Sequence, residues 1–229
     1  MYNGAHVGPA FSVPVVRRTL PMIAIVNYDM GNLDSVARAF RKCGAEAVIT
    51  SNPEEISRAA GVVLPGVGFF DEAMRNLKKR GLDALLTHRA LEERVPFLGI
   101  CLGFQMFTKH SEEGDAPGLG WIDGVTRRFR FEGAETPLKV PHMGWNELSP
   151  WKDSPLLEGI APDSCFYFAH SYCVSCAEED AVLATTCYGT EFVSAVARDN
   201  LFGVQFHPEK SHRAGLQMIA NFIGMSRHA

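Results

Sequence analysis

The chain reads Pro96-Phe97-Leu98-Gly99-Ile100-Cys101-Leu102-Gly103-Phe104-Gln105 at its most informative point. Residues 96–100 form a short apolar run typical of a buried strand, and residues 102–109 can continue as a helix. A tight strand-to-helix turn needs neighbours without a Cβ, because the chain bends sharply and a ligand must approach the backbone. Gly99 and Gly103 meet that need. The segment therefore predicts Cys101 near a helix N-terminus, where the helix dipole favours a thiolate.

The pattern around this segment predicts the fold class. Strand-like runs alternate with helical stretches, the strands at 23–27, 47–49, 61–65 and 96–100 and the helices at 32–43, 53–60 and 70–93. This alternation predicts an α/β fold with an open, mostly parallel sheet flanked by helices. From about Gly120 onward the chain is strand-rich, with runs at 125–131, 166–168, 182–188, 192–198 and 201–206 that we expect to extend the sheet as hairpins, before a closing helix at 214–225.

Composition indicates one globular domain. A chain of 229 residues that is 46% hydrophobic and 21% charged can bury a sizeable core within single-domain size. A formal net charge of −4 offers no basic footprint for nucleic acid, and no apolar run is long enough to cross a bilayer. We therefore expect neither nucleic acid nor membrane as a partner.

Residues 1–21 differ from the rest. They hold three prolines and no Asp or Glu, and they show no period before the first strand-like run. We expect a disordered extension at 1–21 and the folded domain at 22–229. A transit peptide or a start codon assigned upstream of Met22 would explain the same composition.

The six cysteines predict a reduced, cytoplasmic protein, because no signal-type segment precedes them. Cys173 and Cys176 form a CxxC motif, but no second motif completes a metal site. No phosphate-binding loop or dinucleotide fingerprint appears. We expect no metal and no cofactor.

A second reactive motif follows the apolar run at 202–206. His207 and Glu209 are two residues apart, so in an extended segment both side chains leave the same face. The carboxylate could then orient the imidazole. With Cys101 as nucleophile, this predicts a triad in which His207 is base and then acid and Glu209 fixes its tautomer. Taken singly, a buried structural cysteine and a structural histidine explain the same residues.

The two motifs together resemble the class I (triad) glutamine amidotransferases over residues 22–229. The resemblance rests on residues 99–105, on Gly203-Val204-Gln205-Phe206-His207-Pro208-Glu209 and on Leu64-Pro65-Gly66-Val67-Gly68. Within that family, further segments are similar to the glutaminase subunits of imidazole glycerol phosphate synthase, a histidine-pathway enzyme. These segments are Asn27-Tyr28-Asp29-Met30-Gly31-Asn32-Leu33, Val140-Pro141-His142-Met143-Gly144-Trp145-Asn146, Tyr167-Phe168-Ala169-His170-Ser171-Tyr172 and His207-Pro208-Glu209-Lys210-Ser211.

The resemblance implies roles for further residues. Backbone N–H groups of the oxyanion segment and of the residue after the nucleophile would receive the glutamine carbonyl oxygen, namely Gly66, Val67, Gly68 and Leu102. The implied glutamine-binding residues are Gln105, Glu113, Ser171 and Tyr172. The implied partner-interface residues are Asn32, Trp145, Tyr167 and Lys210. Ordinary surface or packing duty is the alternative for the four glutamine-binding residues, and core packing is the alternative for the aromatic Trp145 and Tyr167.

The resemblance also implies a reaction and a partner. Glutamine would be hydrolysed to glutamate and ammonia through a cysteine thioester. The ammonia would pass to a separate (β/α)₈ barrel cyclase in a heterodimer, forming imidazole glycerol phosphate and an aminoimidazole carboxamide ribotide (AICAR). The alternatives are the glutaminase subunit of another synthase, a stand-alone γ-glutamyl hydrolase, or a non-catalytic regulatory module.

Overall fold

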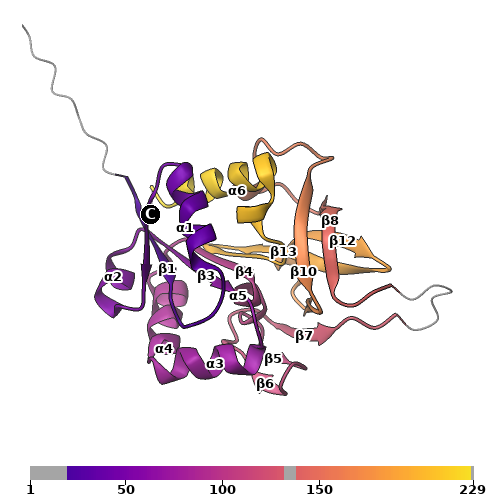
Figure 1. The fold of residues 1–229 in the computed structure, drawn as a ribbon, viewed down its shortest axis with the longest axis horizontal. Coiled ribbons are helices and arrows are strands. Elements are labelled where there is room, and N and C mark those ends of the chain that lie inside the picture. The colour runs from indigo at the N-terminus through magenta and orange to yellow at the C-terminus, as the bar shows by residue number, and fades with distance from the viewer. Residues whose placement is uncertain (1–19, 132–137, 228–229) are drawn as a thin grey trace, which may run out of the picture.

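The computed structural model describes residues 20–131 and 138–227. Its sheet contains a run of parallel strands in the order β2-β1-β3-β4-β14, of which Figure 1 labels β1, β3 and β4. These strands are β1 (Met22–Val26), β2 (Glu46–Thr50), β3 (Gly61–Gly66), β4 (Phe97–Cys101) and β14 (Leu201–Val204). The predicted α/β fold is confirmed, in a sheet that is mixed overall.

Helices cover both faces of the parallel strands, because the apolar runs bury both sides. Ile23 and Ile25 face a core that includes residues of α1 (Leu33–Lys42) and α6 (His212–Met225). Ala24 and Val26 face a second core, which includes residues of the helices on the other face: α2 (Pro53–Arg58), α3 (Phe70–Lys79) and α4 (Leu82–Thr87).

Two helix predictions were wrong in length. The helix expected at 70–93 is broken by Gly81, whose positive φ of 65° begins α4, and it ends in a π-helical turn at His88–Glu92. The helix expected at 102–109 is only α5 (Leu102–Gln105). Carbonyl groups that a longer helix would use instead accept the N–H groups of later residues, as Met106 accepts from Leu119.

The C-terminal half continues the sheet with antiparallel strands. β14 follows β13 (Thr190–Arg198) through a tight turn at residues 199–200. The remaining strands of this sheet are β5 (His110–Ser111), β6 (Ala116–Pro117), β7 (Gly124–Arg128), β9 (Ser149–Pro150), β11 (Tyr172–Cys176) and β12 (Val182–Tyr188), and 3-10 turns lie at Pro155–Leu157, Glu179–Ala181 and Pro208–Lys210.

One predicted strand does not extend the sheet. Among the described residues, β10 (Cys165–His170) pairs only with β8 (His142–Glu147), and together they form a separate two-stranded ribbon. Phe166 and Phe168 point from this ribbon into the core, and their rings lie 4.4 and 5.5 Å from that of Phe206. These rings pack on Phe206, just beyond the end of β14, so the ribbon covers the core instead of pairing with the sheet.

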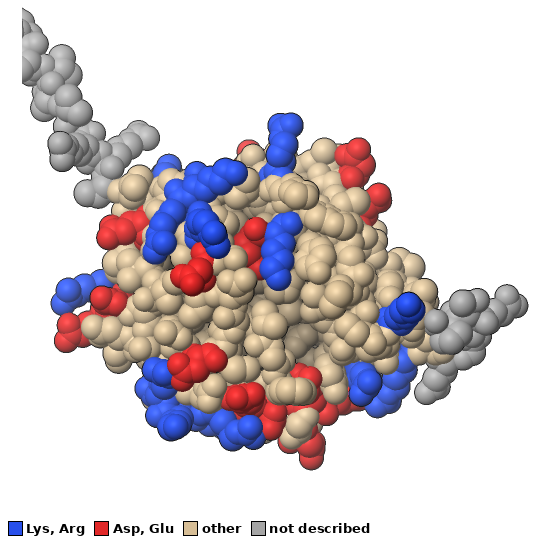
Figure 2. Space-filling view, in the orientation of Figure 1, with Lys and Arg blue, Asp and Glu red and all other residues tan. Residues whose placement is uncertain are grey.

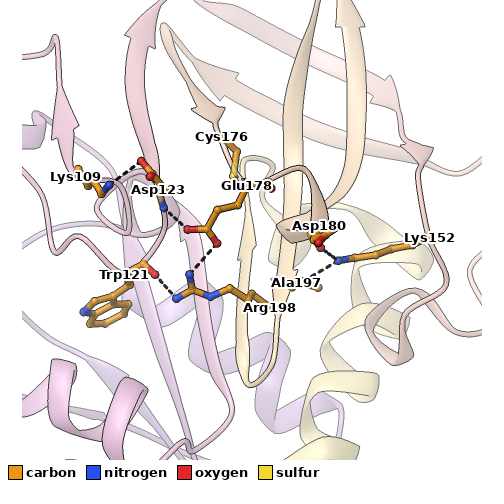
Figure 3. Close-up of polar contacts among 9 residues, drawn as sticks. All are labelled: Lys109, Trp121, Asp123, Lys152, Cys176, Glu178, Asp180, Ala197 and Arg198. Atoms are coloured by element: carbon orange, nitrogen blue, oxygen red, sulfur yellow. Dashed lines mark hydrogen bonds and ion pairs between the residues drawn. The ribbon is translucent and has the colours of Figure 1, made fainter.

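A network of hydrogen bonds and ion pairs connects the antiparallel strands of the C-terminal half to the loop before β7 (Figure 3). Arg198 pairs with Glu178 at 2.9 Å and also donates to the Trp121 carbonyl oxygen. Glu178 accepts from the backbone N–H of Asp123 at 2.8 Å, and Asp123 pairs with Lys109. The network lowers the pKa of Glu178, chiefly through the Arg198 hydrogen bond.

The ends of the chain are described only in part. Residues 1–19 of the extension expected at 1–21 lie outside the described residues, whereas Pro21 is buried and its carbonyl accepts from Glu46 at 3.1 Å. In the part that the structure describes, no helix has the length and apolar character to span a membrane.

Candidate active site

Cys101 lies where β4 ends and α5 begins, on a backbone with φ 54° and ψ −110°. A positive φ is strained for a residue with a Cβ, so the surroundings must hold it. The neighbouring glycines allow this. A Cβ on Gly103 would overlap the Leu64 carbonyl oxygen, and one on Gly99 would lie 2.8 Å from the Phe104 backbone. The predicted turn is confirmed, but a helix of four residues contributes little dipole to the thiolate.

The predicted base, His207, follows β14, the parallel strand next to β4. Val204 of β14 pairs with Ile100 of β4, so both strands end at the same edge of the sheet. His207 Nδ1 and Glu209 Oε1 are 2.9 Å apart, with both side chains nearly buried. The extended conformation predicted for residues 207–209 is wrong. Pro208 starts a 3-10 turn, which brings the Glu209 carboxylate back to the His207 imidazole.

The electrostatics of the pair favour a charged imidazole. Burial acts to lower the pKa of His207, but the nearby Cys101 sulfur and the Glu209 carboxylate outweigh it and raise that pKa to about 10. The imidazole therefore holds its proton near neutral pH. The arrangement can supply an anionic sulfur nucleophile and a proton for a leaving group.

A pocket of about 240 Å³ opens beside Cys101. Its lining includes seven of the eight residues expected to bind glutamine or its oxyanion: Val67, Gly68, Leu102, Gln105, Glu113, Ser171 and Tyr172. Gly66 is the exception. It is buried at the end of β3, where it pairs with Cys101 and where a Cβ would collide with Tyr28. The structure thus brings the predicted substrate-binding residues together around the sulfur.

Glu113 has a structural contact as well. Its Oε2 accepts from the backbone N–H of Phe70 at 3.0 Å, at the start of α3. Burial raises the pKa of this carboxyl, and the Phe70 hydrogen bond acts against that change. One carboxylate therefore borders the pocket and caps a helix.

Three of the four expected interface residues form one exposed cluster, in which Tyr167 is half-buried. Trp145 on β8 is paired with Tyr167 on β10, and the Lys210 ammonium lies 5.6 Å from the Tyr167 ring centroid. Trp145 is 47% exposed. Asn32 instead caps α1, where its side chain accepts from the Ser35 N–H at 3.3 Å.

Sequence reasoning missed two features near the sulfur. Gln205 is fully buried and donates to Cys101 Sγ at 3.7 Å. His142 and His170 form a buried pair whose ring nitrogens are 3.3 Å apart. A glutamine inside the apolar run at 202–206 was the available signal for the first, because a buried amide needs partners.

The comparisons with known proteins agree with this geometry. The family model described as glutamine amidotransferase class-I matches residues 24–225. In fold, the chain is similar to the structure of PurLQS from Thermotoga maritima, with a TM-score of 0.67, 17% identity, and 92% and 99% of the two chains covered. A glutamine amidotransferase from Thermotoga maritima gives a TM-score of 0.57 at 18% identity, covering 82% and 76%.

Relatives found by sequence identify the subfamily as well as the family. The chain is 46% identical to the imidazole glycerol phosphate synthase subunit HisH 2 of Methanococcus maripaludis over 202 residues, which cover 88% of this chain and 98% of the relative. It is 50% identical to the HisH subunit of Aromatoleum aromaticum over 207 residues, covering 88% and 97%. The chain belongs to the class-I glutamine amidotransferase family and, within it, to the HisH subunits of imidazole glycerol phosphate synthase.

Proposed function

We propose that this chain hydrolyses glutamine through a thioester on Cys101 and passes the ammonia to a separate cyclase subunit in histidine biosynthesis. The observation that carries the proposal is that Cys101, which borders the pocket, and the His207 and Glu209 pair follow two adjacent parallel strands that end at the same edge of the sheet, close enough for the sulfur to raise the pKa of His207. Open α/β sheets hold ligands at this edge.

The reaction has two stages. The Cys101 thiolate attacks the γ-carboxamide carbon of glutamine, and His207 protonates the departing ammonia as the thioester forms. Water then attacks the thioester, His207 takes a proton from it, and glutamate leaves. Backbone N–H groups of Val67, Gly68 and Leu102, all bordering the pocket, would hold the oxyanion.

The pocket suits a small amino acid. Its volume of about 240 Å³ is modest, and polar side chains border it. Gln105, Ser171 and Tyr172 would seat glutamine, and the Glu113 carboxylate would hold its α-ammonium group. All six cysteines are free, which agrees with the cytoplasmic location that we expect.

The partner would dock over the exposed cluster of Trp145, Tyr167 and Lys210. Met143 is 64% exposed and also borders the pocket, so this surface adjoins the site where ammonia forms. A second hollow of about 440 Å³ beside it has a basic rim that includes Arg38, and Figure 2 shows basic side chains gathered over α1. Exposed aromatic groups with a charged rim are typical of protein interfaces. We propose the (β/α)₈ barrel cyclase as the occupant.

Glutamate release by the purified chain tests the proposal, measured with and without a histidine-pathway cyclase and its ribonucleotide substrate. We expect weak glutaminase activity alone and strong stimulation by the liganded cyclase. Cys101→Ala should abolish glutamate release while ammonia-dependent cyclisation survives.

Other outcomes would point elsewhere. Equal turnover with and without the cyclase would favour a stand-alone hydrolase. No turnover under any condition would favour a regulatory module. Stimulation only by a different synthase would keep the chemistry and change the partner.

A further inference from the structure

A continuous chain of buried polar groups leads from the ribbon strand β8 to the nucleophile. His142 lies 3.3 Å from His170, and His170 Nδ1 lies 2.8 Å from the Tyr172 carbonyl oxygen. Gln105 Nε2 donates to the same carbonyl at 2.9 Å and to Gln205 Oε1 at 3.2 Å. Gln205 Nε2 then reaches Cys101 Sγ at 3.7 Å. The triad mechanism uses neither the histidine pair nor Gln205.

The Tyr172 carbonyl fixes the direction of every bond in this chain. A carbonyl oxygen can only accept, so Gln105 must turn its NH₂ group toward it. The second hydrogen of that NH₂ group points at Gln205, which must therefore present its oxygen to Gln105. The NH₂ group of Gln205 is left facing the sulfur. The amide orientations thus follow from a backbone atom whose identity is certain.

The histidine pair obeys the same constraint. His170 must carry its proton on Nδ1 to donate to Tyr172, so its Nε2 accepts from His142 Nδ1. His170 must be neutral for this, because a proton on its Nε2 would remove the acceptor. Burial lowers the pKa of His142 to about 4 and that of His170 to about 3. The pair therefore holds the Tyr172 carbonyl in place without adding charge near the site.

We infer that Gln205 stabilises the Cys101 thiolate by an amide hydrogen bond, and that Gln105 acts as a positioning residue that orients Gln205. This inference rests on the proposed function and assigns a further residue to its nucleophile. The short helix α5 contributes little dipole, so the sulfur needs another donor besides His207. Gln205 is fully buried, and a buried amide facing an anion makes a stronger hydrogen bond than one facing a neutral group.

The inference has a specific kinetic signature. The hydrogen bond is strongest while the sulfur is an anion and weakens as the carbon–sulfur bond forms. Gln205 therefore increases the population of thiolate rather than stabilising the tetrahedral intermediate. Loss of the donor should slow attack by Cys101 near neutral pH, and higher pH should restore alkylation, which needs the thiolate but not the proton on His207.

Alkylation of Cys101 by iodoacetamide over a pH series, followed by mass spectrometry of the Cys101 peptide, tests the inference on the full chain. In Gln205→Met, which keeps the side-chain length without a donor, we expect the midpoint of the rate–pH curve to rise by about one pH unit, with the plateau at high pH unchanged. Gln105→Met should raise the midpoint by less. Ser194→Ala is the matched control. Ser194 is buried, and its backbone carbonyl accepts from the backbone N–H of Gln205, so this substitution should leave the midpoint unchanged.

An unchanged midpoint in Gln205→Met with a folded circular-dichroism spectrum would overturn the inference, even if glutaminase activity fell. If Gln205→Met does not fold, an unchanged midpoint in Gln105→Met overturns it instead. Alkylation needs neither glutamine nor the cyclase. A wild-type chain that releases no glutamate would therefore refute the proposed function and leave this test intact.

Discussion

β4 and β14 are neighbours in the sheet, yet they present their reactive side chains by different means. Cys101 sits on a backbone with φ 54°, whereas His207 has an ordinary φ of −105° and precedes a proline turn. The first position is held by close packing around glycines. The second is held by hydrogen bonds, since Glu209 binds the ring and Ser211 Oγ donates to the His207 carbonyl at 2.6 Å.

This difference predicts that substitutions at the two positions impair the protein in different ways. A steric error beside the nucleophile has no room to relax, because Gly103 packs on the backbone of Leu64. A lost hydrogen bond beside the base leaves the backbone in place. Substitutions at the first site should therefore remove folding and activity together, and substitutions at the second should separate them.

Gly103→Ala should have the largest effect, because its methyl group would overlap the Leu64 carbonyl oxygen. We expect a loss of about 3 kcal/mol or more in the free energy of unfolding, together with loss of glutaminase activity. Urea unfolding followed by fluorescence measures it. Gly224→Ala in α6 is the control, since no described residue beyond its chain neighbours and its own helix backbone lies within 4 Å of its added Cβ. Equal stability of the two variants would contradict the steric account.

Glu209→Gln should have the second-largest effect. The amide keeps the shape but cannot stabilise the imidazolium, so the pKa of His207 should fall from about 10. We expect kcat to drop on the order of 10³-fold. Stability should change much less than in Gly103→Ala. Steady-state glutamate release and thermal unfolding on the same sample measure both, and a variant with wild-type kcat would remove Glu209 from the triad.

Acid should destabilise the ribbon that supports the base. The pKa values of His142 and His170 are lowered to about 4 and about 3, below the ordinary 6.5, so the unfolded chain binds protons that the folded chain does not. Their contribution is complete above about pH 6.5 and is lost as pH falls toward 3, by on the order of 2 kcal/mol for each ring at pH 5. Unfolding at a series of pH values measures it. His142→Phe should flatten this dependence; an unchanged slope would show that other groups cause it.

Ser211→Ala should have the smallest effect of the four. Its hydroxyl accepts from the Tyr167 N–H at 3.0 Å and donates to the His207 carbonyl, so its loss leaves two buried backbone groups without this partner. We expect a loss of about 1 kcal/mol in stability with a modest fall in kcat. Ser194→Ala is the control, because its buried hydroxyl has no partner among the described residues. Identical melting temperatures for the two variants would contradict the role assigned to Ser211.

The sequence predicted those parts of the site that depend on local pattern. Apolar runs located β4 and β14, and the glycines around Cys101 indicated its turn. The length of α5 was not predictable, because distant N–H groups such as that of Leu119 take the carbonyls that a longer helix would use. The contact of Gln205 with Cys101 depends equally on the pairing of β14 with β4. Such contacts arise from tertiary structure, which no local pattern encodes.

The central claim is that glutamine is hydrolysed through a thioester on Cys101. Acid quenching of the chain during turnover with glutamine and the liganded cyclase, followed by mass spectrometry of its peptides, tests this most directly. We predict one glutamyl group on the Cys101 peptide, absent from Cys101→Ala. Glutamate formation with an unmodified Cys101 peptide and an active Cys101→Ala variant would contradict the claim.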